Sequence, residues 1–218
     1  PIVVIANYVL DTLHQDHFRV ADGTLSECLV AVGTKRKRNL KKAGAVKHLE
    51  LTRDYRPIGL PYYDNAAIDG VLKAYVDELE SADFLLPVGM IRCLEAFTDM
   101  SQGPLLALIG DMGYRDVAEL EGLRGDFMTV IDNYAWLNGN NFNALQKYFH
   151  AAGGLAMLSD EPESRFVTGV FVHGAVPNDL SETIQAIDQK IRNLGPREVC
   201  GLLAGLTNED AVPSLGPE

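Results

Sequence analysis

The sequence predicts an α/β fold, and three observations carry that prediction. Residues 2–6 (IVVIA) and 104–109 (PLLALI) are continuous apolar runs, as in strands covered on both faces of a parallel sheet. Each run ends in polar or glycine residues, as strands do at the ligand-binding edge of an open α/β sheet. Between and after these runs, apolar residues recur at helical spacing.

The segments after the first run predict a loop and then antiparallel strands. Residues 7–16 are expected to leave the strand as a polar loop with at most one helical turn. Residues 18–32 predict a hairpin, because Asp22 and Gly23 form the pair that a tight two-residue turn favours. Residues 46–57 are expected to be extended and to end at Pro57.

Three further segments predict helices. Over residues 64–81 the apolar residues share one face of a 3.6-residue period, and Asp64 is a plausible N-cap. A second helix is expected from Pro87, after the short apolar segment Phe84–Leu86. A third covers residues 141–152, with Gly153 as its C-cap. The inward residues of the three are Ile68, Val71, Leu72, Tyr75, Val76 and Leu79; Met90, Cys93, Leu94 and Phe97; and Phe142, Leu145, Phe149 and Ala152.

The end of the chain predicts a hairpin and a last helix. Residues 127–131 are expected to be extended, and residues 154–158 and 166–172 to be strands. Asp179 and Glu182 form a capping box for the helix, which Gly195 and Pro196 end. Residues 209–218 predict a frayed tail.

Composition excludes several classes of function. Net charge is −11, and six of the 19 Lys and Arg residues lie in the run 35–42, which is interpreted as a solvated loop. The acidic remainder argues against nucleic-acid binding, and no apolar run is long enough to span a membrane. Cys28, Cys93 and Cys200 are too widely spaced for a disulfide framework, which favours a cytoplasmic protein.

The common nucleotide, metal and hydrolase motifs are absent from this sequence. In particular, no glycine-rich phosphate loop follows the first run, where a nucleotide-binding α/β chain normally carries it. Asp11, His14, Asp16 and His17 lie close together, but a solvated loop explains them better than a metal site, and no metal is predicted. His150 and His173 are interpreted as structural.

Asn7, Tyr8 and Asp11 are the strongest candidate site residues. They follow a strand that would end at the ligand crevice of the sheet. Asn supplies an amide donor and acceptor, Tyr a stacking face, and Asp a charge that orients a ligand or accepts a proton. The residues alone leave two explanations open: a functional site, or a polar strand exit with Asp11 capping the next turn.

At these residues the sequence resembles a known family. The stretch ANYVLDTLHQDHF is similar to N-E-[VLF]-[LF]-D-[AST]-[LI]-P of the MidA-like class I S-adenosylmethionine-dependent methyltransferases, and most similar to a bacterial, tetratricopeptide-associated branch with Tyr at the Glu position. Four further segments resemble that branch in order: RPIGLPYYDN, FLLPVGMIRCLEAF, LLALIGDMGY, and DFMTVIDNYAWL running to FHAAGGLAML.

The resemblance implies a partial class I methyltransferase (Rossmann-like) sheet, strands four to seven. Residues 2–6 would be the fourth strand, residues 104–109 the fifth, and residues 154–158 and 166–172 the closing hairpin. An insertion of about residues 18–100 would carry the extra hairpin and helices within a single domain, residues 1–218. The first three strands, with the glycine loop, would lie upstream.

The resemblance also implies roles for residues. Asn7 and Asp11 would be catalytic, Ala6 and Asn7 would contact S-adenosylmethionine, and the methyl acceptor would be a protein or a small molecule. Tyr8, Asp111, Tyr114 and Tyr134 would bind the substrate. Two departures matter: Tyr8 replaces a Glu, which argues against arginine as acceptor, and His14 replaces a proline.

Three hypotheses follow for the whole protein. The first is an enzyme of which this chain is the C-terminal part, the second a non-catalytic methyltransferase-like scaffold, and the third an unrelated α/β domain. For the chain alone, we expect weak or no binding of S-adenosylmethionine, and self-association through an exposed sheet edge.

Overall fold

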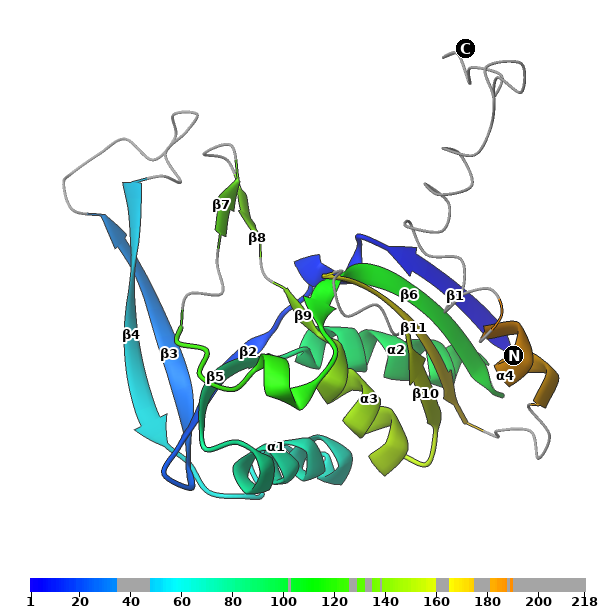
Figure 1. The fold of residues 1–218 in the computed structure, drawn as a ribbon, viewed down its shortest axis with the longest axis horizontal. Helices are drawn as coiled ribbons and strands as arrows, with labels where there is room; N and C mark the ends of the chain where they lie inside the picture. The colour runs from blue at the N-terminus through cyan, green and yellow to red at the C-terminus, as the bar shows by residue number, and fades with distance from the viewer. Residues whose placement is uncertain are drawn as a thin grey trace, which may run out of the picture. The chain divides into compact units, whose positions relative to one another are not determined.

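The computed structural model describes residues 1–34, 48–101, 103–125, 129–131, 135–137, 139–159, 165–174, 181–187 and 189 (Figure 1). The chain divides into two compact units, Pro1–Leu158 with Ser164–Val176, and Ser159–Glu163 with Pro177–Glu218. The second unit contains the described helix α4 (Ser181–Ile187). The other described helices and strands belong to the first unit. The predicted basic loop at 35–42, Tyr134, the cap at Asp179 and the tail from 209 lie outside the described residues.

A mixed sheet forms the centre of the first unit. Its strands run in the order β1 (Ile2–Asn7), β6 (Leu105–Tyr114), β11 (Phe166–His173) and β10 (Leu155–Leu158). β1 and β6 are parallel, with Ile2 opposite Leu105 and Asn7 opposite Gly110, whereas β11 is antiparallel to both β6 and β10. These strands confirm the four predicted from the apolar runs, and the α/β class with them.

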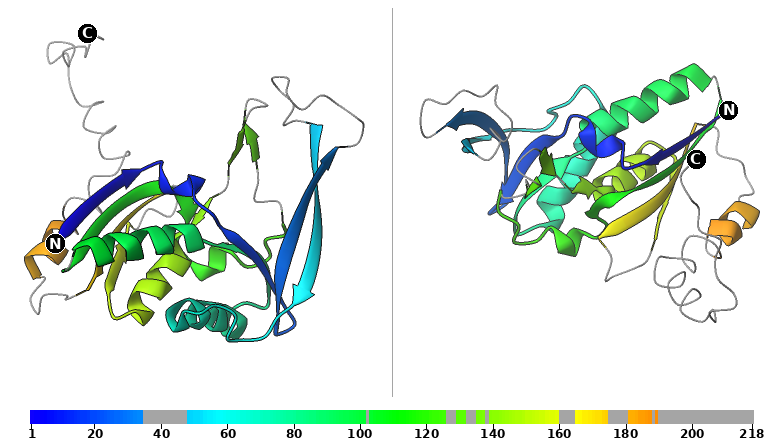
Figure 2. Two further views of the ribbon diagram at one scale, coloured as in Figure 1. Left: turned by 180° about the vertical axis from the view of Figure 1, so that it is seen from behind. Right: turned by 90° about the horizontal axis from the view of Figure 1, so that it is seen from above.

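Two helices lie against one face of this sheet (Figures 1 and 2). α2 (Val88–Ser101) packs under β1 and β6, and α3 (Phe142–Ala151) under β6, β10 and β11. α1 (Ala66–Glu78) packs on α3. The alternate residues of β6 that face these helices are fully buried: Leu105, Ala107 and Ile109. The core therefore lies between the sheet and one layer of helices.

The prediction that residues 2–6 are covered on both faces is wrong for the described part of the chain. β1 lies at the edge of the mixed sheet, and the side chains of Val3 and Ile5 are 61% and 77% exposed. Ala6, on the opposite face, is 7% exposed. Among the described residues, no strand pairs with the outer edge of this apolar strand and nothing covers one of its faces.

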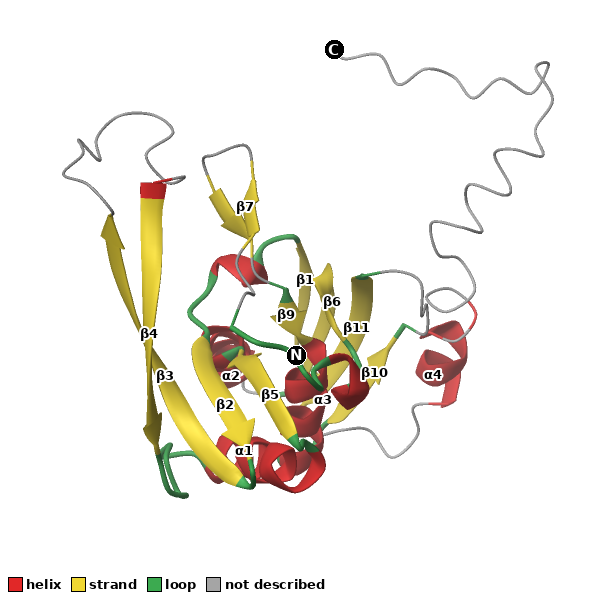
Figure 3. Ribbon diagram, turned by 60° about the vertical axis from the view of Figure 1, so that its left-hand side comes forward, coloured by secondary structure: helices red, strands yellow, loops and turns green. Residues whose placement is uncertain are grey.

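A separate antiparallel sheet precedes α2 in the chain. Its order is β4 (Leu49–Pro57), β3 (Thr24–Thr34), β2 (Asp16–Ala21) and β5 (Ser81–Leu86) (Figure 3). Asp22 and Gly23 have φ of +50° and +71°, so the predicted hairpin turn is confirmed. A two-stranded ribbon pairs β7 (Thr129–Ile131) with β8 (Ala135–Leu137).

Several predicted boundaries are corrected. The N-cap of α1 is Asn65 rather than Asp64, because its side chain accepts hydrogen bonds from the N–H groups of Ala67 (3.0 Å) and Ile68 (3.2 Å). The helix ends at Glu78 rather than near 81, because Ser81 begins β5. The start of α2 after Pro87 is confirmed. The third helix spans Phe142–Ala151 with Ala152 as its C-cap, so Gly153 (φ +76°) follows the cap rather than forming it.

β6 is longer than the apolar run that predicted it. It continues from Ile109 to Tyr114, because its second half pairs with β11 and with β9 (Asn140–Asn141). Gly113 permits the second pairing: a Cβ at this position would lie 2.2 Å from the backbone oxygen of Asn140. Asp111 and Tyr114 are therefore strand residues rather than loop residues.

Two remaining features concern the described part of the chain. Cys28 is buried, Cys93 is half-buried, and both are free thiols; Cys200 lies outside this part. No described helix combines the length and the apolar character that crossing a membrane requires.

Candidate functional site

The candidate site begins where β1 ends. Asn7 lies opposite Gly110, and the Tyr8 N–H donates a hydrogen bond to the Gly110 carbonyl (3.0 Å), which extends the pairing by one residue. The chain then turns into the short 3₁₀ helix η1 (Leu10–Thr12). β6 continues past this point, so the end of β1 lies beside the middle of β6. The predicted polar exit of the strand is thus present.

Tyr8 is held in an unusual backbone conformation. Its φ of +52° is uncommon for a bulky residue and costs conformational energy. Its side chain is 54% exposed, and its ring lies 5.4 Å from that of Phe166, measured between centroids. Such strain is concentrated at functional sites, and here it presents an aromatic face at the strand end.

Asn7 lies directly over the backbone of β6. A Cβ at position 110 would come within 2.9 Å of Asn7 Oδ1 and 2.8 Å of the Phe166 ring. A larger residue at position 110 would therefore displace the ends of these two side chains. Gly110 lets the Asn7 amide and the Phe166 ring lie against the strand.

Asp11 and Asp111 come together at this edge although they are far apart in the sequence. Asp111 is 1% exposed, and its Oδ1 accepts a hydrogen bond from the Met112 N–H (2.8 Å). Burial raises the pKa of Asp111, and the nearby charge of Asp11 raises it further. The N–H groups of Met112 and Asp11 and the side chain of Asn140 oppose this rise. Asp111 Oδ2 and Asp11 Oδ1 are buried and accept no hydrogen bond from the described residues.

Asn140, on β9, adjoins the same carboxyl group. It is 1% exposed and close enough to Asp111 to influence the pKa of that residue. Neither its Oδ1 nor its Nδ2 makes a hydrogen bond within the described chain. The neighbouring Asn141 differs, since its Oδ1 accepts from the Ala144 N–H (2.9 Å) and its Nδ2 donates to the Leu85 carbonyl (3.0 Å). Asn143 donates to the Arg115 carbonyl (3.2 Å).

The structure thus brings together most of the predicted site residues. Ala6, Asn7 and Tyr8 lie at the end of β1, and Asp11 lies beside Asp111 of β6. Tyr114 lies at the far end of β6, opposite Asn141, with its ring 5.9 Å from the Arg165 guanidinium. Tyr114 therefore shares the strand β6 with Asp111 but lies three residues further along it.

Sequence reasoning missed Asn140, Gly110 and Phe166 as members of the site. Phe166 and Asn140 reach it because β11 and β9 both pair with β6. Asn140 stands in the run NGNNFN, in which Asn141 caps α3 and therefore carries the local signal. Nothing in the sequence separates the Asn that caps from the Asn that faces Asp111.

The polar residues between positions 11 and 17 face different partners. His14 Nε2 lies 2.6 Å from Asp16 Oδ1, Asp16 also accepts from the Tyr63 hydroxyl, and His17 Nε2 lies 3.5 Å from Asp83 Oδ2. The part of the chain that the structure describes contains no group of three His, Cys, Asp or Glu residues able to hold a metal ion.

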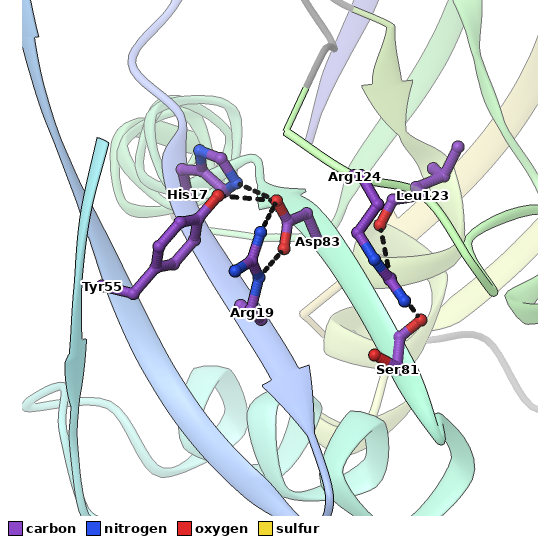
Figure 4. Close-up of polar contacts among 7 residues, drawn as sticks. All are labelled: His17, Arg19, Tyr55, Ser81, Asp83, Leu123 and Arg124. Atoms are coloured by element: carbon purple, nitrogen blue, oxygen red, sulfur yellow. Dashed lines mark hydrogen bonds and ion pairs between the residues drawn. The ribbon is translucent and has the colours of Figure 1, made fainter. Parts of the chain in front are cut away.

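A second polar cluster lies in the antiparallel sheet, around Asp83 of β5 (Figure 4). Asp83 is 0% exposed; its carboxylate accepts hydrogen bonds from Arg19 Nε, Arg19 Nη2 (2.9 Å) and the Tyr55 hydroxyl (2.8 Å), and His17 faces it. Burial alone would raise the pKa of Asp83, but the contacts from His17, Arg19 and Tyr55 hold it well below its usual range. The Arg19 guanidinium also lies 3.6 Å from the centroid of the Tyr55 ring.

The two clusters differ in what they can do. The Asp83 carboxylate is already neutralised and joins β2, β4 and β5, so its role is structural. We call Asn7, Tyr8, Asp11, Asp111 and Asn140 the strand-end cluster. It has buried acceptor oxygens without hydrogen bonds and an exposed aromatic ring, so it is the candidate binding site. Comparisons with protein-family models, curated proteins and solved structures find no match to this chain.

Proposed function

We propose that this chain is the C-terminal part of an S-adenosylmethionine-dependent methyltransferase with a class I fold, similar to the MidA-like family. The observation that carries the proposal is the order of the mixed sheet. A parallel pair, β1 and β6, is followed by the hairpin β10–β11, which lies against β6. The resemblance implies this sequence of elements for the fourth and fifth strands and the closing hairpin.

The second face of the mixed sheet supports the same proposal. Val3 and Ile5 are exposed there, and Leu106 and Leu108 of β6, on the same face, are half-buried. A sheet with apolar residues on both faces is typical of folds with helices on both sides. The remaining strands of the proposed fold would pair with the free edge of β1, and their helices would cover this face.

The residues at the strand end fit one side of the proposed cofactor site. Bound S-adenosylmethionine would supply an electrophilic methyl group on sulfur. Ala6 and the Asn7 amide would hold the cofactor near this group, and the exposed Tyr8 ring would pack on cofactor or substrate. The adenosine side of the site would belong to the upstream strands.

Two carboxyl groups are available for proton transfer. Asp11 follows the strand end directly, and the buried Asp111 has a raised pKa. A carboxylate whose pKa is raised is a better base than an exposed one, which suits removal of a proton from the methyl acceptor. In the proposal, Asp11 orients the acceptor, and the pair of carboxyl groups holds its proton.

The test uses the protein produced from its complete reading frame. We expect micromolar binding of S-adenosylmethionine by calorimetry and transfer of a radiolabelled methyl group to a cell extract or to the protein itself. Asp11→Asn should reduce transfer at least about tenfold while binding of the cofactor persists. Asp77→Asn, an exposed residue of α1 paired with Lys73 (2.9 Å), is the matched control.

The outcomes separate the enzyme from the scaffold. The 218-residue chain alone should bind S-adenosylmethionine weakly or not at all. If the complete protein also fails to bind it at millimolar concentration, the methyltransferase proposal is wrong, and the scaffold hypothesis takes its place. Reading the coding DNA upstream of the codon for Pro1 gives an independent check, since a strand ending in a glycine-rich turn is expected there.

A further inference from the structure

The strand-end cluster contains more buried acceptors than donors. Among the described residues, Asp11 Oδ1, Asp111 Oδ2 and Asn140 Oδ1 are buried acceptors without a hydrogen bond, and Asn140 Nδ2 is the matching donor. Asp111 lies between the other two on the sheet, because Asn140 is opposite Gly113, two residues further along β6, and Asp11 follows the end of β1, where Asn7 is opposite Gly110. Buried polar groups in folded proteins are nearly always hydrogen-bonded, so these atoms require a partner from outside the described chain.

The neighbouring polar side chains do have hydrogen-bond partners. Asn141 is fully used in capping α3 and holding β5, and the hydroxyl of Tyr75 lies within hydrogen-bonding distance of Asn141 Oδ1 (3.1 Å) and Asn143 Oδ1 (3.0 Å). Of the three asparagines, only Asn140 has a side chain whose two polar atoms make no hydrogen bond of normal geometry with the described residues. It is also the one beside Asp111. Buried polar atoms without hydrogen bonds cost stability unless a group from outside the described residues pairs with them.

We propose that Asp11, Asp111 and Asn140 form a binding site for a primary ammonium group of a ligand. An ammonium group has three N–H donors and no acceptor, and the cluster offers three acceptor oxygens without donors. Its positive charge would compensate the two carboxylates, which gives short, strong hydrogen bonds.

Other cations fit the cluster less well. Magnesium and calcium ions take six or more oxygen ligands, of which this cluster would supply three. A guanidinium group is a planar fork of five donors that prefers bidentate contact with one carboxylate. Asp111 already accepts the Met112 N–H on Oδ1, so only Oδ2 is open to such a fork.

The proposed function connects this site to the methyl acceptor. If the protein is a methyltransferase, the acceptor is a primary amine whose ammonium group gives one proton to the Asp111 carboxylate before the nitrogen lone pair is free. This assignment of the acceptor rests on the proposed function. The binding of an ammonium group does not.

The experiment compares two cations of equal charge. Thermal unfolding of the protein from its complete reading frame is measured with methylammonium chloride and with tetramethylammonium chloride, at matched ionic strength and without S-adenosylmethionine. Tetramethylammonium has the same charge but no N–H donor, so the difference isolates hydrogen bonding. Magnesium chloride and dilute guanidinium chloride form two further arms.

We expect methylammonium to raise the melting temperature by a few degrees and tetramethylammonium to have no such effect. Asp111→Asn and Asn140→Ala should weaken the methylammonium effect at least about tenfold in concentration, and Asp77→Asn should leave it unchanged. Circular dichroism confirms that each variant folds. Equal shifts for the two ammonium ions, an unchanged response in Asp111→Asn, or a response to magnesium or guanidinium alone would overturn the proposal.

The two proposals fail separately. Methylammonium binding without any methyl transfer would leave the ammonium site standing and contradict the methyltransferase. Methyl transfer to an oxygen, carbon or guanidinium acceptor, without methylammonium binding, would support the methyltransferase and contradict the ammonium site.

Discussion

Asp83 and Asp111 are the same residue type with the same burial, yet their surroundings are opposite. Asp83 is 0% and Asp111 1% exposed. The carboxylate of Asp83 is enclosed by Arg19, Tyr55 and His17, and its pKa is lowered. Asp111 accepts a hydrogen bond from the Met112 N–H on Oδ1, has no cationic partner among the groups that shift its pKa, lies near the carboxylate of Asp11, and has a raised pKa.

The difference separates a structural carboxylate from a candidate functional one. Where the chain itself neutralises a buried charge, removing one partner leaves the other uncompensated and destabilises the fold. A buried charge left short of donors costs stability, which natural proteins tolerate mainly where a ligand supplies the donors. The following predictions test that distinction, beginning with the largest effect.

Asp83→Asn should destabilise the fold by about 3 kcal/mol, because it leaves Arg19 without its buried counter-charge. Urea denaturation measures this free energy of unfolding. Asp77→Asn breaks an exposed i,i+4 ion pair and should cost less than about 0.5 kcal/mol. Equal losses for the two variants would contradict a structural role for the Asp83 cluster.

The two buried carboxylates should also respond oppositely to pH. An unfolded Asp titrates near 3.8. Because its folded pKa is lower, Asp83 stabilises the protein fully above pH 3.8 and loses this effect as the pH falls through the folded value. Because its folded pKa is raised, Asp111 favours folding below pH 3.8 and loses this contribution as the pH rises through the raised value.

Urea denaturation of the wild type, Asp83→Asn and Asp111→Asn, from neutral pH to below pH 3.8, checks these two opposite pH dependences. The deficit of Asp83→Asn should shrink on acidification. Asp111→Asn should be at least as stable as the wild type at neutral pH, and any advantage should vanish in acid. A deficit of Asp111→Asn that grows with pH would mean that its charge is well compensated.

Ile5→Lys should leave folding nearly unchanged but reduce self-association of the 218-residue chain. The side chain is 77% exposed, so the change in free energy of unfolding should stay within about 0.5 kcal/mol. A charge on an edge strand opposes pairing with a second copy. Sedimentation velocity measures the effect. Met100→Lys is the control, because Met100 is 71% exposed and lies on the helix α2 rather than on a strand.

Tyr8→Asn should have two opposing effects on stability that largely cancel. Asn adopts a positive φ more readily than Tyr, which offsets the lost contact with Phe166, so the net change should be below about 1 kcal/mol. Binding of S-adenosylmethionine to the protein from its complete reading frame, measured by calorimetry, should weaken nevertheless. Tyr8→Phe keeps the ring and the strain; if it weakens binding as much as Tyr8→Asn, the hydroxyl rather than the aromatic face is required.

The sequence by itself predicted the elements whose signals are local. Apolar runs marked β1 and β6, the Asp22–Gly23 pair marked a hairpin, and helical spacing marked α1, α2 and α3. It also marked Asn7, Tyr8 and Asp11 as a polar strand exit. These features depend on residues within one turn or one strand of each other, so short-range patterns suffice to predict them.

Only the tertiary structure decided what those residues face. The register of β1 and β9 on β6 places Asp11 and Asn140 beside Asp111, and the pairing of β2 with β5 places Arg19 opposite Asp83. Register depends on backbone pairing between distant segments and not on the identity of one side chain. For this reason the residues of β5 and β6 alone do not reveal that the charge of Asp83 is neutralised and that of Asp111 is not.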